Sequence, residues 1–254
     1  MSSNGSNNIK RLWIFDFDGT LSPLVSHRKK ATLPESSGRL LYRLAADPES
    51  RVAIISSRAL DDLIRKVSIP GIYLGGGSGL EWRLPDKNRV MPPGIYIEKL
   101  LKARKVVDPL LEKFSTIRGV DLEEKCWSVA LHFRNVGPDE WIRVSSMIKE
   151  LRKYPGICVF EGPAVAEVQF FRSANKSFGV RRLCRMLGFR PDGNIFYAGD
   201  DENDAKAMKW IVSRNGTAII VGGIINLRGI PRVNGPEELV RAVNALFDRR
   251  SPVY

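Results

Sequence analysis

The sequence is poor in histidine and cysteine, with two histidines and three cysteines among 254 residues. The cysteines Cys126, Cys158 and Cys184 are odd in number and far apart, which suits neither a disulfide framework nor a zinc cluster. His27 and His132 supply little material for a histidine-built metal site or a Ser-His-Asp triad. Any metal ion must therefore be bound by carboxylate oxygens, which favours magnesium.

Long hydrophobic runs are also absent. The longest candidate, residues 218–225, falls well short of the ~20 apolar residues that a membrane-spanning helix needs. Residues 1–9 are polar and lack the basic start and apolar core of a secretion signal. We therefore expect a cytoplasmic protein with no membrane partner, and 43% hydrophobic residues predict a well-filled core.

The chain carries a formal net charge of +12, which raises nucleic acid or an anionic substrate as a partner. The basic clusters are spread along the chain, at 28–30, 102–105, 181–182 and 249–250. They lack interleaved aromatic residues and a known nucleic-acid module. This dispersion favours solvated surface charge over a nucleic-acid site, and the sequence leaves the oligomeric state open.

Apolar strand-like runs alternate with amphipathic helical patterns toward both ends of the chain. The strand-like runs lie at 12–16, 51–55, 194–198 and 217–221, and the helical patterns at 35–46, 59–67, 177–187, 203–211 and from Pro236 onward. Such alternation predicts βαβ units and hence an α/β fold with a parallel sheet.

The middle of the chain has a different pattern, with alternating strands at 127–133 and 166–171 and amphipathic helices at 98–114 and 139–152. We therefore predict an α+β insertion at 80–170, between two parts of the core at 1–79 and 171–254. The glycine-rich run at 73–79 lacks the spacing and the lysine of a phosphate-binding P-loop, so we interpret it as a turn or hinge.

Two aspartates stand one residue apart in IFDFDGTLSP, residues 14–23. If residues 12–15 form a buried strand, Asp16 and Asp18 lie at its carboxyl end, where open α/β sheets place their ligands. Side chains at i and i+2 of a strand face the same way, which predicts one shared site. A strand end followed by an Asp-Gly turn is the alternative interpretation.

Further polar residues follow the other predicted strands. GDDEND at 199–204 places Asp200 and Asp201 after one strand, Ser56 follows another, and Lys176 opens a helix. Ser56 would stand at a helix start and offer a hydroxyl and a backbone N–H to phosphate oxygens. A carboxylate ~4 Å from a phosphate charge costs about 4 kcal/mol at an effective dielectric of about 20. A divalent cation and a lysine offset that repulsion, so the set predicts phosphoryl chemistry.

This set resembles the haloacid dehalogenase (HAD) superfamily of phosphohydrolases over nearly the whole chain. The resemblance implies a Rossmann-like parallel-sheet core with an inserted α+β cap of the C2B type. It also implies that Asp16 is the nucleophile that forms an aspartyl-phosphate, that Asp18 is the general acid and base, and that Lys176 is a catalytic cation. The remaining implied ligands are Gly19, Thr20, Ser56 and Ser57 for phosphate, and Asp16, the backbone carbonyl of Asp18, Asp200 and Asp204 for Mg²⁺, with Asp204 also supporting Lys176.

The insertion resembles the cap of trehalose-6-phosphate phosphatases at LEEKCWSVALHFR (122–134) and EGPAVAEVQF (161–170). VAIISSR at 52–58 and GGSGLEWR at 76–83 are similar to stretches of the same family. The resemblance implies that Glu123, Lys125 and Glu167 hold sugar hydroxyls and that Arg58 belongs to the substrate-binding residues. The expected activity is Mg²⁺-dependent hydrolysis of trehalose-6-phosphate, a small sugar phosphate, to trehalose and inorganic phosphate.

The sequence departs from that family's pattern at Ser78, where histidine is usual, and at Asn203 and Ala205. These departures leave other substrates open, including sucrose phosphate and mannosyl- or glucosyl-3-phosphoglycerate. A phosphomutase shares the same core residues. A nucleic-acid- or anion-binding protein is the non-enzymatic alternative.

Overall fold

The computed structural model describes residues 9–25, 28–162, 164–171 and 175–250. His27 and most of the polar start of the chain lie outside these residues. The chain divides into two compact units, the first formed by Met1–Val90 with Asn175–Tyr254 and the second by Met91–Ala174. Among the described residues, none of the helices combines the length and the apolar character that crossing a membrane requires.

The first unit is built on an eight-stranded sheet with the order β12-β11-β10-β1-β2-β3-β4-β5. Its strands are β1 Arg11–Phe15, β2 Ser50–Ile55, β3 Tyr73–Gly76, β4 Glu81–Arg83, β5 Arg89–Val90, β10 Ile195–Gly199, β11 Thr217–Val221 and β12 Arg232–Val233. The pairs from β12 to β3 are parallel, whereas β4 and β5 are antiparallel to their neighbours. The parallel α/β core predicted from the sequence is therefore confirmed.

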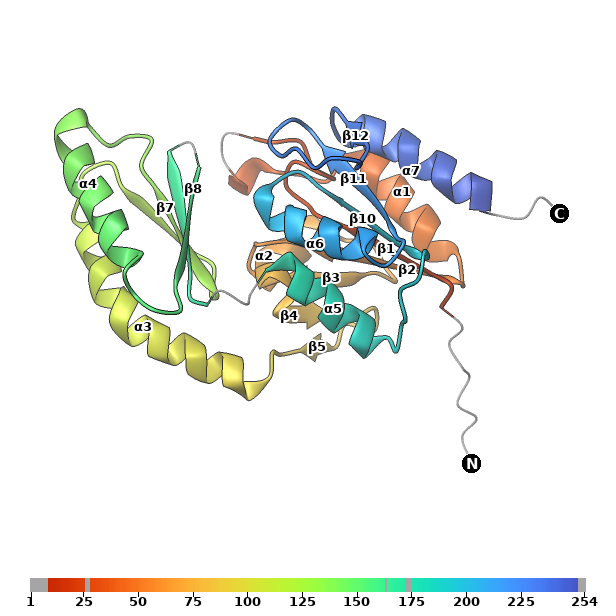
Figure 1. Ribbon diagram of the computed structural model, residues 1–254, viewed down its shortest axis with the longest axis horizontal. Coiled ribbons are helices and arrows are strands. Elements are labelled where there is room, and N and C mark those ends of the chain that lie inside the picture. Colours follow the sequence, from red (N-terminus) through yellow and green to blue (C-terminus); the bar gives the residue numbers. More distant parts are fainter. Residues whose placement is uncertain (1–8, 26–27, 163, 172–174, 251–254) are drawn as a thin grey trace. The chain divides into compact units, whose positions relative to one another are not determined.

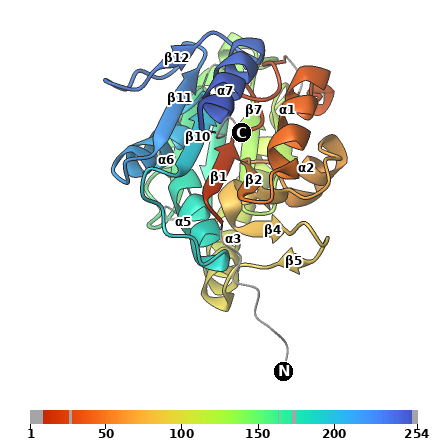
Figure 2. The same ribbon diagram turned by 90° about the vertical axis from the view of Figure 1, so that its right-hand side faces the viewer.

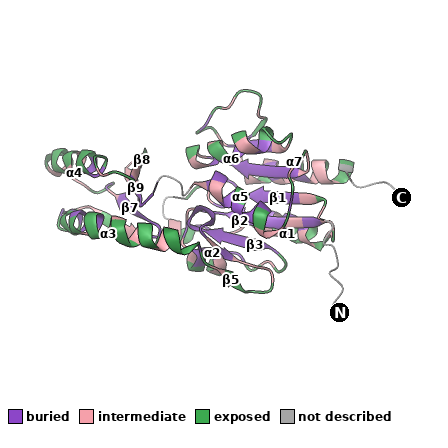
Figure 3. Cartoon of the chain, turned by 60° about the horizontal axis from the view of Figure 1, so that its bottom comes forward, coloured by how far each residue is buried: buried purple, intermediate pink, exposed green. Residues whose placement is uncertain are grey.

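Helices cover both faces of this sheet (Figure 2). They are α1 Glu35–Ala46, α2 Leu60–Lys66, α5 Lys176–Met186, α6 Glu202–Val212 and α7 Pro236–Arg250, with short 3-10 turns η1 Arg28–Lys30 and η2 Gly77–Gly79. Trp13 and Phe15 of β1 pack with α1, α2 and α7, while Leu12 and Ile14 pack with α5 and α6. The central strands β1, β2, β10 and β11 are thus buried on both faces (Figure 3), as their nearly continuous apolar sequences require.

The second unit is a four-stranded antiparallel sheet, β6-β7-β9-β8, with two helices on one side of it (Figure 1). Its elements are α3 Gly94–Ser115, β6 Asp121–Glu124, β7 Ser128–His132, α4 Pro138–Leu151, β8 Cys158–Gly162 and β9 Val165–Gln169. Val129 and Leu131 of β7 are buried, whereas His132 is half-buried, as expected for a strand with one apolar and one polar face.

The second unit begins at Met91 rather than at residue 80, because β4 and β5 extend the core sheet beyond β3. The glycine-rich run is also not a hinge, since residues 73–76 form β3 and the next three residues form a tight turn. A Cβ atom on Gly75 would lie 2.9 Å from the Trp82 ring, and one on Gly76 would lie 2.5 Å from the Leu60 backbone. Close packing therefore explains these glycines.

Candidate active site

Three predicted site residues follow three adjacent strands at the centre of the core sheet. Asp16 comes directly after β1, Ser56 after β2 and Asp200 after β10, and β1 pairs with both other strands in parallel register. The backbone N–H of Asp16 donates to the carbonyl of Ala198 at 2.9 Å, so the parallel pairing continues past the end of β1. The carboxyl ends of these strands thus bring the three residues to one edge of the sheet.

Lys176 joins two of the predicted acids. Its Nζ lies 2.7 Å from Asp16 Oδ1 and 2.8 Å from Asp204 Oδ1, and all three side chains are buried. Lys176 is the first residue of α5, which Asn175 caps by accepting the Phe178 N–H at 3.1 Å. The helix start therefore fixes where the lysine enters the site.

Asp204 is a supporting residue with four hydrogen bonds. Its Oδ1 accepts from Lys176 and, at 2.6 Å, from the hydroxyl of Tyr197. Its Oδ2 accepts the backbone N–H groups of Asp200 at 3.1 Å and Asp201 at 3.2 Å. The Asp201 carboxylate completes a reciprocal capping box at the start of α6. These contacts place Asp204 as the support for Lys176 and for the loop that carries Asp200.

Asp200 lies against the turn that carries the DGT sequence. A Cβ atom on Gly19 would be 2.2 Å from Asp200 Oδ2, and Gly19 has a φ of +79°. Glycine is therefore needed here both for the left-handed backbone and for the close approach of the carboxylate. The hydroxyl of Thr20 donates to Asp200 Oδ1 at 3.5 Å. Gly19 and Thr20 thus shape the environment of Asp200.

Negative charge exceeds positive charge in this cluster. Asp16, Asp200 and Asp204 each offer a carboxylate oxygen within 4.8 Å of the others, and Lys176 contacts two of them, Asp16 and Asp204. Burial is the largest influence on Asp200; Lys176 opposes it, but Asp204 adds to it, and the pKa rises to about 7. Burial likewise raises the pKa of Asp16 well above its usual value despite the attraction of Lys176.

This excess of buried carboxylates fits a divalent cation. Hard oxygen ligands close together are what Mg²⁺ binds, and a cation would offset charge that the lysine leaves uncompensated. Asp16 and Asp200 suit direct ligation, because the oxygens of Asp204 already accept four hydrogen bonds. Asp16 and Asp200 are thus suited to the magnesium site expected from the sequence, whereas Asp204, also expected as a ligand, supports Lys176 and the Asp200 backbone.

We expect Asp200→Asn to stabilise the metal-free protein. The pKa of Asp200 is about 7 in the folded state and about 3.8 as a free side chain, so between these values the folded state binds more protons. Its stability must then fall as pH rises, and the loss is complete above pH 7. An amide does not ionise, so the gain in unfolding free energy should be small at pH 4.5 and on the order of 1–4 kcal/mol at pH 8.

Urea unfolding at both pH values in the presence of a chelator measures this effect. Glu202→Gln, which changes an exposed acid in the first turn of α6, is the control and should alter stability little. A D200N protein that is less stable than wild type at pH 8 would show that the carboxylate is compensated in another way.

Asp18 has hydrogen-bond partners outside the Lys176 cluster. β1 ends at Phe15, so Asp16 and Asp18 belong to the following turn rather than to the strand. Both Asp18 oxygens accept from Arg58, Oδ1 from Nη2 at 2.5 Å and Oδ2 from Nε at 2.7 Å. The two aspartates therefore have different partners, although the charge of Asp18 still contributes to the raised pKa of Asp16.

The predicted phosphate-binding residues use several of their backbone groups internally. The Ser56 N–H donates to Gly75 O at 2.9 Å and the Gly19 N–H to Ser22 O at 2.8 Å. α2 begins at Leu60, so Ser56 does not stand at a helix start as the sequence suggested. Ser56 Oγ accepts the Arg58 N–H at 3.2 Å, and Ser57 Oγ accepts from Arg28 at 3.5 Å. The backbone N–H groups of Ser56 and Gly19 are therefore engaged within the protein.

In the second unit, the predicted sugar-binding residues share one face of the sheet. Glu123 and Glu167 both lie opposite Ala130 in the strand register, one from each side. Lys125 Nζ contacts Glu167 Oε2 at 3.0 Å, and Ser128 Oγ donates to Glu167 Oε1 at 2.9 Å. Glu123 contacts His132 Nε2 at 3.0 Å. This face is polar and charged, in contrast to the apolar face beneath it.

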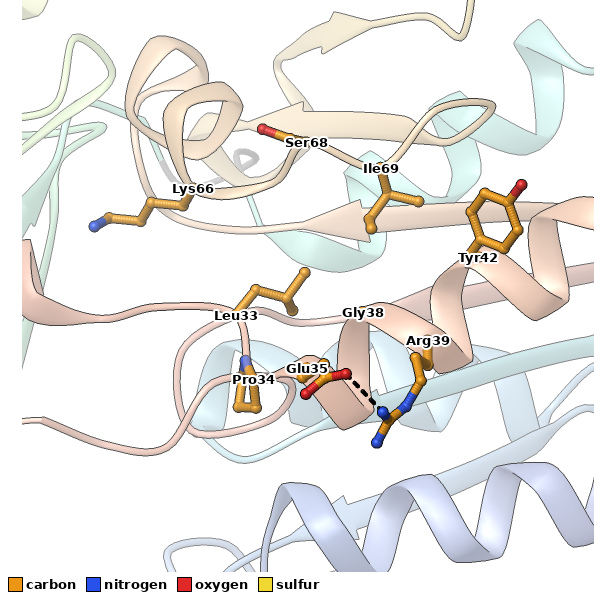
Figure 4. A pocket seen from close by; sticks show the side chains of 9 residues that line it. All are labelled: Leu33, Pro34, Glu35, Gly38, Arg39, Tyr42, Lys66, Ser68 and Ile69. Carbon is orange, nitrogen blue, oxygen red and sulfur yellow. Dashed lines mark hydrogen bonds and ion pairs between the residues drawn. The ribbon is translucent and has the colours of Figure 1, made fainter.

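The sequence interpretation missed Tyr197 and the contact between Arg58 and Asp62. Tyr197 precedes GDD by two residues, and Arg58 and Asp62 have the i, i+4 spacing of a helical ion pair, so the second contact left a detectable signal. A separate hollow beside α1 is lined by Leu33, Tyr42 and Ile69 among others (Figure 4), and its lining contains none of the predicted site residues. Its charged pair, Glu35 and Arg39, is joined at 2.6 Å.

Comparison with known proteins agrees with this geometry. The family described as trehalose-phosphatase matches residues 14–224. A trehalose-phosphate phosphatase from Mycobacterium marinum is 32% identical over 247 residues, which cover 94% of this chain and 57% of that protein. The chain thus spans a little over half the length of this relative.

Solved structures share the fold. The C-terminal domain of a C. albicans trehalose-6-phosphate phosphatase has a TM-score of 0.77 at 21% identity, with 94% of this chain and 92% of that chain covered. A phosphatase of the HAD superfamily from Bacteroides thetaiotaomicron has a TM-score of 0.59 at 17% identity, with 97% and 98% covered. The family match over residues 14–224 and the 32% identity to the Mycobacterium marinum protein show that this chain belongs to the trehalose-phosphatase family.

Proposed function

We propose that this protein is a phosphatase that hydrolyses trehalose-6-phosphate to trehalose and inorganic phosphate. The observation that carries the proposal is the buried contact of Lys176 with Asp16, at 2.7 Å, within a cluster of carboxylates. Membership of the trehalose-phosphatase family supports the choice of substrate. The relatives' names describe proteins that are longer than this chain, so the activity has to be tested on the chain itself.

Asp16 is the proposed nucleophile. Lys176 holds its Oδ1, which orients the carboxylate so that its second oxygen can attack phosphorus. The Asp16–phosphorus bond forms as the bond from phosphorus to the sugar oxygen breaks, and Asp18 donates a proton to that leaving oxygen. Asp18 then takes a proton from the water that attacks the phosphorus of the aspartyl-phosphate, and the bond from phosphorus to Asp16 breaks to release inorganic phosphate and the free carboxylate. Lys176 would balance the negative charge of the phosphate oxygens, and the Ser56 hydroxyl would bind them through a hydrogen bond.

We infer that Mg²⁺ is the cofactor, held by Asp16, Asp200 and the backbone carbonyl of Asp18. When bound, it would supply positive charge beside the phosphoryl group and so reduce the repulsion between phosphate and carboxylates. The support for this inference is the surplus of buried carboxylates around one lysine. Asp204 would act behind these ligands through its bonds to Asp200 and Lys176.

A phosphate-release screen with Mg²⁺ tests the substrate. We expect trehalose-6-phosphate to have a higher kcat/KM than sucrose-6-phosphate, glucosyl-3-phosphoglycerate or glucose-6-phosphate. A higher kcat/KM for one of the other substrates would change the assigned sugar phosphate but leave the proposed phosphatase mechanism in place. Isomerisation of glucose phosphates without net phosphate release, dependent on a bisphosphate activator, would indicate a phosphomutase and overturn the proposal.

The polar face of the second unit is the proposed sugar-binding surface. Glu123, Lys125 and Glu167 offer carboxylate acceptors and an ammonium donor on one face, a set that suits a substrate rich in hydroxyl groups. Hydroxyl contacts of this kind bind the sugar at a distance from the phosphorus. These contacts should therefore raise kcat/KM only for substrates that carry the sugar.

We expect Glu123→Gln and Glu167→Ala to lower kcat/KM for trehalose-6-phosphate by roughly ten- to a hundredfold, since each lost contact costs on the order of 1–3 kcal/mol. Hydrolysis of 4-nitrophenyl phosphate, which lacks the sugar, should change less than about twofold. Glu161→Ala is the control, because Glu161 is an exposed acid of the same sheet whose ion-pair partner is Arg152. Equal losses for both substrates would assign Glu123 and Glu167 a structural role instead.

A further inference from the structure

Arg58 is almost completely buried, with a side chain 2% exposed, yet it contacts two carboxylates. Its Nε and Nη2 donate to Asp18 at 2.7 and 2.5 Å, and Nη2 also donates to the Arg28 backbone carbonyl at 2.8 Å. Its Nη1 donates to Asp62 Oδ2 at 2.5 Å. With both edges of the guanidinium engaged inside the protein, Arg58 is oriented toward Asp18 rather than toward a ligand.

Asp62 is the anchor at the far side of this guanidinium. It stands in the first turn of α2, and its carboxylate is about one third exposed. Burial raises the pKa of Asp62, but the hydrogen bond and charge of Arg58 outweigh burial and lower it. Because the guanidinium is rigid and planar, a bond that fixes Nη1 also fixes the direction of the Nε–Nη2 edge. Asp62 therefore fixes the orientation of Arg58, and Arg58 fixes the orientation of Asp18.

We propose that Asp62 and Arg58 are positioning residues that hold the Asp18 carboxyl group in the orientation for proton transfer to the leaving oxygen, with the proton on an oxygen lone pair that Arg58 does not occupy. The inference rests on the proposed function, in which Asp18 is the general acid. Arg58 grips both oxygens of Asp18, so it sets the plane of the carboxylate as well as its distance. The Phe17 ring, with its centroid 5.5 Å from the guanidinium carbon, supports Arg58 from one side.

The chain offers a matched control for Asp62. Asp61 is the neighbouring acid in the first turn of α2, so it has the same charge and nearly the same place relative to the helix dipole. Its ion-pair partner is Arg89, on β5, and not Arg58. Asp62 also pairs with the exposed Arg65 at 3.5 Å, so Asp61→Ala and Asp62→Ala differ in the buried contact with Arg58 and in this exposed ion pair.

Two small substrates separate positioning from general damage. Phenolate is a poorer leaving group than 4-nitrophenolate, so phenyl phosphate needs the proton from Asp18 more than 4-nitrophenyl phosphate does. The parameter is kcat/KM, which reports only the steps up to loss of the leaving group. Neither substrate contains a sugar, so the result does not depend on which sugar phosphate the protein hydrolyses.

We expect Asp62→Ala to lower kcat/KM for phenyl phosphate by about tenfold and for 4-nitrophenyl phosphate by less than about twofold, a fraction of the ~10²–10⁴ that general acids contribute. Arg58→Lys keeps the positive charge but loses the planar guanidinium that donates to both Asp18 oxygens, and it should give the same selective loss. Asp61→Ala should leave both substrates within about twofold of wild type. Thermal unfolding of each variant checks that the fold is intact.

The Asp18→Asn variant distinguishes a failure of the proposed acid role of Asp18 from a failure of the positioning role of Asp62 and Arg58. If Asp18→Asn itself shows no selective loss for phenyl phosphate, the acid role of Asp18 in the proposed function is wrong. If Asp18→Asn shows the selective loss but both Asp62→Ala and Arg58→Lys lose activity equally on the two substrates, or not at all, the positioning role is overturned. If Asp62→Ala does not fold, Asp62→Asn and Arg58→Lys decide by the same ratio.

Discussion

The Asp16→Asn protein should release phosphate from trehalose-6-phosphate at less than about one thousandth of the wild-type rate. An amide oxygen is a far weaker nucleophile than a carboxylate, so the aspartyl-phosphate would not form at a useful rate. The substitution also removes the charge that pairs with Lys176 at 2.7 Å. A thousandfold loss corresponds to roughly 4 kcal/mol of activation free energy, which is within reach of losing a covalent step.

The Asp16→Asn protein should nevertheless fold. Asp16 is buried and its pKa is raised well above the usual value, so the neutral amide relieves charge repulsion within the carboxylate cluster. Asp86→Asn, at an exposed position in the loop between β4 and β5, is the control for the substitution itself and should retain full activity. Activity above a few per cent of wild type in an Asp16→Asn preparation free of deamidated protein would refute Asp16 as the nucleophile.

The sequence predicted which edge of the sheet carries the candidate site because parallel strands obey a simple rule. Their carboxyl ends meet at one edge, so Asp16, Ser56 and Asp200 could be placed together without knowing any distance. Lys176 and Asp204 depended on the resemblance to HAD phosphatases, since a helix start alone does not say which carboxylate a lysine contacts. The structure supplies those contacts, at 2.7 Å to Asp16 and 2.8 Å to Asp204.

Short strands escaped the sequence analysis because their pairing partners define them. β3 contains two glycines and β6 is the acidic run DLEE, and neither segment has the β-branched composition of a typical strand. β4 is three residues long and is held by antiparallel pairing with β3, which is why the core sheet extends to Val90. Tertiary context decided these elements, and local propensity did not.

The sequence alone likewise could not show which backbone N–H groups are already used in hydrogen bonds within the protein. Ser56 was expected to offer its N–H to phosphate, but the pairing of β2 with β3 consumes that group at 2.9 Å from Gly75 O. The choice between Asp200 and Asp204 as metal ligands is of the same kind. Both are acids of the GDDEND stretch, and only the four hydrogen bonds accepted by Asp204 identify it as the support.

Exhaustive chelation should remove all activity, and Mg²⁺ should restore it while Ca²⁺ restores little. Three carboxylates within 4.8 Å of one another, with one lysine between two of them, leave buried negative charge beside the place where a phosphate must bind. Without a cation, that charge repels the substrate. Ca²⁺ takes longer and more numerous oxygen bonds, so it fits a compact phosphate site poorly.

Metal binding should also stabilise the fold, a result that does not depend on turnover. At a Mg²⁺ concentration about a hundredfold above its Kd, binding to the folded state adds roughly 2.7 kcal/mol, or about 5–10 °C in Tm for a chain of this size. The shift should be large at pH 8 and much smaller at pH 5.5. Asp200 has a pKa of about 7, so at the lower pH a proton competes for the same carboxylate.

Asp200→Asn should abolish most of the shift, whereas Glu202→Gln should keep it. Full activity after chelation, or an equal Mg²⁺ shift in wild type and Asp200→Asn, would remove the cation from this site and leave Lys176 as the cation that the carboxylates contact.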